Sequence, residues 1–254
     1  MGEVECNEAP RYIYKYMSLE SFIELITQHT LYFAIPTTYN DPFDTKMDII
    51  CEGSLDEVKS YWAKQKNSDG QEYNNEQINK IMELSDSQFR KLTSEAFAGL
   101  ISEFRVCCFS QLFDNILMWS HYSDMHKGVC VKFDRTKDAL FSDATPIFYK
   151  EQVPKYNLID GTLNDIRRGI YTKSKDWEYE REIRIIRHTL QGIGYKVSFR
   201  KKALCEVILG CRFPEHKKLA VQAITKKYGY HIALSQMDAS IEEYKLIKRP
   251  IDIK

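Results

Sequence analysis

The feature that most constrains the fold is the order of its short β-forming segments, some adjacent in the chain and others separated by helical segments. Residues 182–188 (EIRIIRH) alternate between polar and apolar side chains, a pattern that predicts a strand. Residues 203–210 and 231–237 are also β-rich and flank a predicted helix at about 214–228. This mixture favours an α+β fold with a mixed or antiparallel sheet over a repeated βαβ pattern.

The remaining segments extend the same pattern. Ser18 is a predicted N-cap for a helix over 21–27, and two further helices are expected over 117–128, ending at Gly128, and over 163–172. Further strands are predicted at residues 11–16, 31–36, 104–110, 128–134, 147–150, 195–199 and 243–248.

Residues 55–103 differ in composition from the rest of the chain. They are rich in Lys, Glu, Gln, Asn and Ser, with apolar residues at helical spacing, which predicts two or three helices with a loop near 67–75. We expect a helical insertion within one domain that spans residues 1–254, because no linker separates this segment from its neighbours.

Charge and cysteine content limit the classes of function. The chain has 36 Lys and Arg against 36 Asp and Glu, so no global field draws it to nucleic acid, which is not favoured as a partner. The seven cysteines form no Cys-x-x-Cys pair, which argues against a disulfide framework and a zinc knuckle. Residues 1–10 are acidic and do not resemble a signal peptide, and no apolar run is long enough to span a membrane. We expect a cytoplasmic protein.

Three motifs contain polar residues that folding alone does not require. The first is TTYNDPFD, which contains Asn40 and Asp41, and the second is CFSQLFDNILMWSHYSDMHKG, which contains Ser110, His121 and Tyr122. The third is KSKDWEYEREIRII, which contains two carboxylates, Glu180 and Glu182, just before and within a predicted strand. The chain has no Walker loop, Gly-x-Gly-x-x-Gly, His-Glu-x-x-His or Gly-x-Ser-x-Gly motif.

The order and wording of these motifs (NDPFD, then MWSHY and HKG, then WEYEREIR) resemble a bacterial family catalogued as domain of unknown function 2971, over about residues 13–246. A more distant resemblance is to the ADP-ribosyltransferases. Those enzymes carry three elements in a fixed order: a polar residue on a first strand, a central strand with Ser or Tyr, and a late Glu-x-Glu before a strand. The matching positions in this chain are Arg11 or Tyr14 for the first element, Ser110 in CCFS for the second and Glu180-Arg181-Glu182 for the third.

This second resemblance implies an ADP-ribosyltransferase-like fold that consumes NAD, as a transferase or a glycohydrolase, and a role as a toxin or antiphage effector. Glu182 would stabilise the oxocarbenium-like transition state and Glu180, on the same strand face, would orient or deprotonate the acceptor. The other expected catalytic residues are Ser110 and His121. Those expected to bind the cofactor are Arg11, Tyr14, Lys15, Asn40, Asp41, Trp119, Tyr122, Trp177 and Arg184.

Each of these residues also has a structural interpretation. Glu178, Glu180 and Glu182 would share one side of a strand, and such a run is typical of a charged, solvated outer face. Asn40 and Asp41 are turn formers, and core packing is the default for Trp119 and Tyr122. His121 and His126 lie five residues apart and would not share a helical face, so a metal site there is not expected.

Two other functions remain open from the sequence. One is a magnesium-dependent nuclease, whose oxygen ligands would come from Asp41, Asp44, Glu180 and Glu182 if these side chains converged. Alternatively, the same residues would form a non-catalytic module that binds a nucleotide or a peptide. The expected partner is a small-molecule nucleotide, and the sequence does not identify an acceptor macromolecule.

Overall fold

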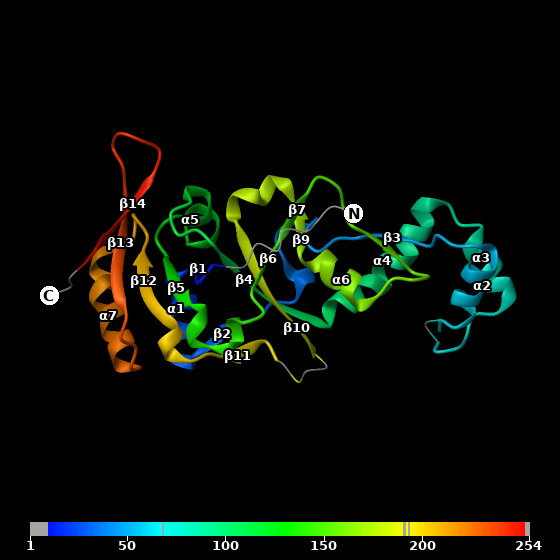
Figure 1. The fold of residues 1–254 in the computed structure, drawn as a ribbon, viewed down its shortest axis with the longest axis horizontal. Coiled ribbons are helices and arrows are strands. Elements are labelled where there is room, and N and C mark those ends of the chain that lie inside the picture. The colour runs from blue at the N-terminus through cyan, green and yellow to red at the C-terminus, as the bar shows by residue number, and fades with distance from the viewer. Residues whose placement is uncertain (1–9, 68, 190–191, 193, 252–254) are drawn as a thin grey trace. The chain divides into compact units, whose positions relative to one another are not determined.

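The computed structural model describes residues 10–67, 69–189, 192 and 194–251 (Figure 1). Residues 1–9, which include Cys6 and most of the segment tested for a signal peptide, lie outside the described residues. The chain divides into two compact units: the first holds residues 1–34, 105–147 and 176–254, and the second holds residues 35–104 and 148–175. The single domain over residues 1–254 stays a prediction.

An eight-stranded sheet forms the centre of the first unit. Its strands, in spatial order, are β14 (Leu246–Pro250), β13 (Ala233–Ala239), β12 (Leu204–Leu209), β5 (Val129–Asp134), β1 (Tyr12–Met17), β4 (Phe104–Ser110), β10 (Glu182–His188) and β6 (Thr145–Pro146). Strands β12 and β13 are parallel, whereas β1 pairs antiparallel with both β4 and β5, and the β5–β12, β6–β10 and β13–β14 pairs are also antiparallel. The predicted α+β class with a mostly antiparallel sheet is therefore confirmed.

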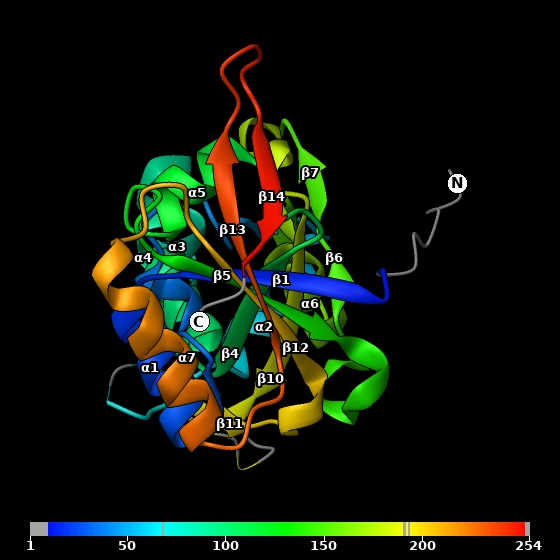
Figure 2. The same cartoon turned by 90° about the vertical axis from the view of Figure 1, so that its left-hand side faces the viewer.

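Three α-helices accompany this sheet: α1 (Leu19–Gln28), α5 (Ile116–Tyr122) and α7 (Lys218–Lys227). The Ser18 Oγ accepts a hydrogen bond from Ser21 N, so the predicted N-cap of the first helix is confirmed. Helices α1 and α7 contact each other and lie side by side in Figure 2. A small second sheet pairs β2 (Thr30–Tyr32) with β11 (Lys196–Ser198).

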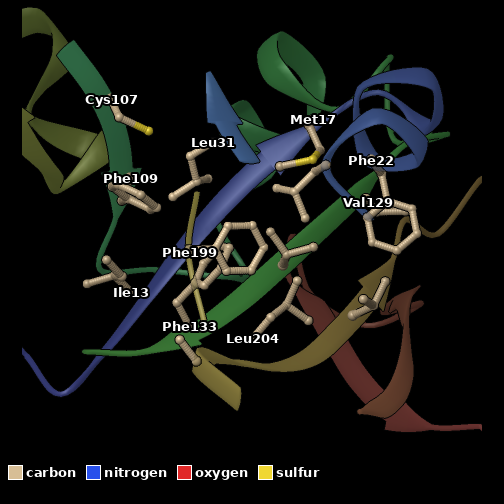
Figure 3. Close-up of a cluster of buried hydrophobic side chains, with 14 of the residues drawn as sticks. Ile13, Met17, Phe22, Leu31, Cys107, Phe109, Val129, Phe133, Phe199 and Leu204 are labelled. Atoms are coloured by element: carbon tan, nitrogen blue, oxygen red, sulfur yellow. The ribbon is translucent and has the colours of Figure 1, made fainter. Parts of the chain in front are cut away.

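The alternation of side chains along β1 separates two apolar clusters on opposite faces of the sheet. Ile13 and Met17 belong to the larger cluster, where they pack with residues such as Phe22 and Phe133 (Figure 3). Tyr14 and Tyr16 point to the other face and belong to a cluster that includes Met118 and Trp119 of α5. Burial of these side chains supplies the apolar driving force for this unit.

The second unit combines short strands with helices. Its helices are α2 (Leu55–Ala63), α3 (Asn75–Met82), α4 (Asp86–Ser102) and α6 (Leu163–Ile170). Its strands form two parallel pairs, β3 (Asp48–Ile50) with β8 (Lys155–Asn157), and β7 (Phe148–Lys150) with β9 (Thr172–Ser174). Residues 55–103, predicted to form two or three helices, form the three helices α2, α3 and α4, and each begins with a capping box.

One predicted helix ends earlier than expected. The helix predicted to run to Gly128 stops at Tyr122, because Asp124, Met125 and His126 all have positive φ angles, of 45°, 49° and 70°. Three consecutive left-handed residues cannot continue a right-handed helix. The strand predicted at 147–150 and the helix predicted at 163–172 are present as β7 and α6, one or two residues shorter.

Candidate functional site

A cavity of about 470 Å³ lies in the first unit, against the C-terminal half of β1. This volume is within the range of about 300–1,000 Å³ typical of small-molecule sites. Residues from β1, α1, β2, α5 and β11 form its wall, and they include Lys15, Ser18, Ser21, Glu24, Tyr32, Tyr122 and Lys196. We call this cavity the β1 cavity.

Next to the β1 cavity, the described pairing of β1 with β4 is shorter than its pairing with β5. Strand β1 pairs with β5 at six positions, but the described pairing between β1 and β4 is at Tyr14 and Ser110. Earlier in β4, Val106 pairs with Ala34, which follows β2. Lys15 connects β1 to β4 at this point, because its Nζ donates a hydrogen bond of 2.9 Å to the Cys108 carbonyl.

Tyr122 connects the β1 cavity to a buried carboxylate. Its side chain lines the cavity, and its hydroxyl donates a hydrogen bond of 2.7 Å to Oε1 of Glu180, which is 2% exposed. Ser110 fixes the backbone at the same point, since its Oγ donates to the Glu180 carbonyl over 2.6 Å and accepts from Leu112 N over 3.0 Å. The structure thus brings together three residues that the sequence selected from two separate motifs.

Glu180 and Glu182 do not alternate along one strand, so that prediction was wrong. Glu180 ends a 3₁₀ helix, η4 (Lys175–Glu180), and β10 begins at Glu182. Arg181 between them has a φ of 46°, a left-handed conformation that a non-glycine residue rarely adopts. This reversal changes the direction of the chain between the two carboxylates, and Gln111 N donates to the Arg181 carbonyl there.

Glu182 is paired with Arg184 on the same face of β10. The Arg184 Nε donates to one carboxylate oxygen over 2.6 Å, and a terminal nitrogen of the same guanidinium donates to the other over 3.0 Å. The Glu182 side chain is 4% exposed and that of Arg184 is fully buried. A solvated outer strand face is therefore wrong as an interpretation of Glu180 and Glu182, because both are buried.

Aromatic rings lie beside Tyr122 and Glu180. The ring of His121 is 6.2 Å from that of Trp177 and 6.1 Å from that of Tyr122, and the Trp177 ring is 5.9 Å from that of Tyr179. His121 is exposed, and the other three side chains are partly exposed. This cluster of His121, Tyr122, Trp177 and Tyr179 offers flat surfaces on which a heterocycle would stack.

Several predicted site residues lie elsewhere. Trp119 is fully buried and its Nε1 donates to the Phe113 carbonyl over 2.8 Å, so its ring belongs to the core. Arg11 pairs with Asp134 over 2.7 Å and does not line the β1 cavity. Tyr14 is buried against Phe113, with ring centroids 5.3 Å apart.

Asn40 and Asp41 belong to the second unit, as does Asp44. The nuclease hypothesis needs Asp41 and Asp44 to converge with Glu180 and Glu182 on a metal ion. In the part of the chain that the structure describes, no group of three or more His, Cys, Asp or Glu side chains is placed to hold a metal. The magnesium-dependent nuclease stays a prediction from the sequence.

Asn115 organises the site, although it was not among the predicted site residues. Its Oδ1 caps α5 by accepting from Leu117 N and Met118 N, and its Nδ2 donates to the Tyr179 carbonyl over 3.0 Å. Asn115 therefore connects the start of the helix that carries Tyr122 to the segment that carries Glu180. An Asn directly before an apolar helical run is a recognisable N-cap signal, so the first of these roles was predictable.

Two cysteines of β4 lie beside the site, and one of them, Cys107, belongs to the larger apolar cluster. Burial raises the pKa of the Cys107 thiol, and burial together with the charge of Glu182 raises the pKa of Cys108 well above its usual range. A thiol with a raised pKa is protonated at neutral pH and is a poor nucleophile.

The fold and the site define an α+β protein with buried carboxylates next to a cavity of ligand size. Residues 118–185, which contain the MWSHY, HKG and WEYEREIR motifs, match the profile of a family described as "Protein of unknown function (DUF2971)". This match is shorter than the resemblance expected over residues 13–246. No curated protein and no solved structure matches the chain. Among the described residues, no helix is both long and apolar enough to cross a membrane.

Proposed function

We propose that the first unit binds NAD in the β1 cavity and cleaves the bond between nicotinamide and ribose, as an ADP-ribosyltransferase-like enzyme or an NAD glycohydrolase. The observation that supports this most is the double contact of Tyr122, which lines the cavity and donates a hydrogen bond to Glu180. A buried carboxylate next to a cavity is the group that a reaction through a cationic transition state requires.

The reaction breaks the bond between C1′ of the ribose and the nicotinamide nitrogen, and nicotinamide leaves with the electron pair. The ribose becomes oxocarbenium-like, and a nearby carboxylate stabilises its positive charge by accepting hydrogen bonds from the ribose hydroxyls. Water or an acceptor nucleophile then forms the new bond to C1′ and gives its proton to a base. The products are nicotinamide and either ADP-ribose or an ADP-ribosylated acceptor.

The two carboxylates of the Glu-x-Glu motif have different surroundings in this proposal. Arg184 donates to both oxygens of Glu182, which neutralises the charge of that group. Tyr122, which lines the β1 cavity, donates from its hydroxyl to one oxygen of Glu180. Because the Tyr122 contact joins Glu180 to the wall of the cavity, we assign stabilisation of the ribose cation to Glu180 and a positioning role at the start of β10 to Glu182, the reverse of the order expected from the sequence.

Other residues supply binding. Lys15 lines the β1 cavity and carries a positive charge for the pyrophosphate, while the His121–Trp177 ring pair offers a stacking surface for a heterocycle. Ser110 and Asn115 hold the backbone at Glu180 and Tyr179 by hydrogen bonds to their carbonyls. The proposal thus uses both the second and the third sequence motif.

Release of nicotinamide from NAD by the purified chain, with cell lysate as a source of acceptors, tests the proposal. The wild type should release nicotinamide, and Glu180→Gln should lose about a hundredfold or more of the rate, as removal of one preorganised charge contact does. Glu178→Gln is the matched control, because Glu178 belongs to the same motif but pairs with Arg181 at the surface. Equal rates in the wild type and Glu180→Gln would contradict the assignment.

Binding without turnover would favour a non-catalytic nucleotide module. If NAD raises the melting temperature of the wild type but no nicotinamide appears, the β1 cavity is a binding site only. A toxin or antiphage role makes one more prediction: induced expression should arrest bacterial growth with the wild type and not with Glu180→Gln.

A further inference from the structure

The NDPFD motif lines a cavity of its own in the second unit. This cavity has a volume of about 900 Å³, at the upper end of the range typical of small-molecule sites. The segment from Pro36 to Ile49 forms one side, residues 90–101 of α4 form another, and residues 152–155 complete it. We call it the α4 cavity, and the function proposed for the first unit does not use it.

Two of the acidic side chains in the α4 cavity already have cationic partners. Asp48 pairs with Arg90, with Oδ1 3.1 Å from Nε. Asp44 lies 3.7 Å from the Lys173 ammonium, and these two side chains are only 5% and 6% exposed. Both pairs are therefore part of the structural framework of the second unit.

Asp41 takes part in neither of these two ion pairs. Its Oδ1 accepts a hydrogen bond of 2.9 Å from Phe43 N, which fixes the turn. Its Oδ2 is buried and accepts no hydrogen bond from the part of the chain that the structure describes. A buried carboxylate oxygen without a donor costs free energy, and a donor from a bound ligand would remove this cost. Asp41 lines the α4 cavity, where a ligand would reach it.

The rest of the wall defines the ligand further. Lys91 and Lys155 are exposed and line the cavity, so they would attract an anionic group. Met47, Phe97 and Ile101 are buried apolar residues of the same wall, and they suit a flat ring. A ligand that fits has a ring with an N–H donor at one end and a phosphate at the other.

We propose that the α4 cavity binds a purine nucleotide whose exocyclic amino group donates a hydrogen bond to Asp41, with the phosphate held by Lys91 and Lys155. A base amino group satisfies the buried Oδ2, and discrimination by such a contact is strong because the partner oxygen is left unpaired when the amino group is missing. The size of the cavity suits a nucleotide better than a single amino acid.

Calorimetric titration with AMP, GMP and IMP tests the base contact. IMP has the same sugar, phosphate and purine ring but no exocyclic amino group. AMP or GMP should bind about tenfold or more tightly than IMP, which corresponds to one good hydrogen bond. Asp41→Asn keeps an acceptor for Phe43 N but presents an amide N–H in place of Oδ2, so it should abolish this preference.

Lys91→Ala/Lys155→Ala should weaken AMP and GMP binding about tenfold or more and reduce its dependence on salt. Lys80→Ala is the matched control, because Lys80 pairs with Glu76 on α3 and does not line the cavity. Thermal unfolding of each variant establishes that it folds. Equal binding of AMP, GMP and IMP, no detectable binding, or unchanged preference in Asp41→Asn would each overturn the proposal.

Discussion

Arg184 donates hydrogen bonds to both carboxylate oxygens of Glu182, two residues before it on β10. Neither side chain is more than 4% exposed, so each ion compensates the charge of the other away from water. Removing one member of such a buried pair costs more stability than replacing both members by apolar residues of similar volume.

Arg184→Met should therefore lower the free energy of unfolding by about 3–5 kcal/mol, because the buried Glu182 loses the guanidinium that compensates its charge. Glu182→Leu/Arg184→Met should recover at least half of this loss, since neither charge of the pair remains. Urea unfolding of the wild type, the single variant and the double variant measures both quantities. A double variant as unstable as Arg184→Met would show that the pair is not the origin of the loss.

Tyr122→Phe removes only the hydroxyl that donates to Glu180. The free energy of unfolding should fall by about 1–3 kcal/mol, because a buried carboxylate loses a donor. If Glu180 stabilises the ribose cation, nicotinamide release should also fall by about tenfold or more.

Tyr32→Phe is the control for this change. Tyr32 lines the same cavity, is 55% exposed and stacks on Tyr195, and its substitution leaves the Glu180 contact intact. Nicotinamide release that falls equally in both variants would mean that the tyrosine rings act through the cavity wall and not through Glu180.

Gly128 of the HKG motif and Gly210, which directly follows β12, are required for a close backbone approach. Gly210 N donates to the Gly128 carbonyl over 3.0 Å. A Cβ at Gly210 would overlap the His126 carbonyl oxygen, and a Cβ at Gly128 would overlap the Met17 carbonyl oxygen. Gly210→Ala should cost about 1–3 kcal/mol or more of stability.

Gly99→Ala is the opposite case. Gly99 lies on the exposed face of α4, and no atom of the described residues beyond its own turn of helix comes within 4 Å of the place that an alanine methyl group would take. An alanine there should raise the free energy of unfolding by about 0.5–1 kcal/mol, since glycine is a poor helix former. Urea unfolding of the two alanine variants checks both signs. A stabilised Gly210→Ala would contradict the close approach.

Local signals predicted much of the fold and little of how its parts combine. The Ser18 cap and the alternation of residues 182–188 were sufficient to predict α1 and β10. The left-handed residues from Asp124 to His126 carry no glycine, so nothing in the composition marked the early end of α5. The inclusion of residues 148–175 in the second unit depends on contacts that are distant in sequence, which periodicity does not report.

The same limit applies to the candidate site. Sequence spacing placed Glu180 and Glu182 on one strand face, because nothing in Glu-Arg-Glu indicates that Arg181 has a φ of 46°. The sequence singled out these two residues because polar and charged groups in a β-forming context need partners. The contact between Tyr122 and Glu180 depends on tertiary structure, which the sequence does not report. The pair of Glu182 and Arg184 follows from strand alternation, because residues two apart point to the same face.

The Arg11–Asp134 pair predicts a loss of stability in acid. Hydrogen bonds from the Arg11 guanidinium, with further ones from Thr136, lower the pKa of Asp134 to about 2. An unfolded Asp has a pKa of about 3.9. The pair therefore contributes its full stabilisation above about pH 4, and that contribution is lost as the pH falls toward about 2, because the unfolded chain takes up a proton before the folded chain does.

Asp134→Asn measures this contribution and keeps an acceptor for Thr136. The difference in free energy of unfolding between the wild type and this variant should be constant above about pH 4 and should shrink as the pH falls to about 2. In an Arg11→Met background the same comparison should show a weaker dependence on pH, because the main cause of the lowered pKa is gone. A difference that stays constant from pH 6 down to about pH 2 would show that the Arg11 contact does not lower the pKa of Asp134 in solution.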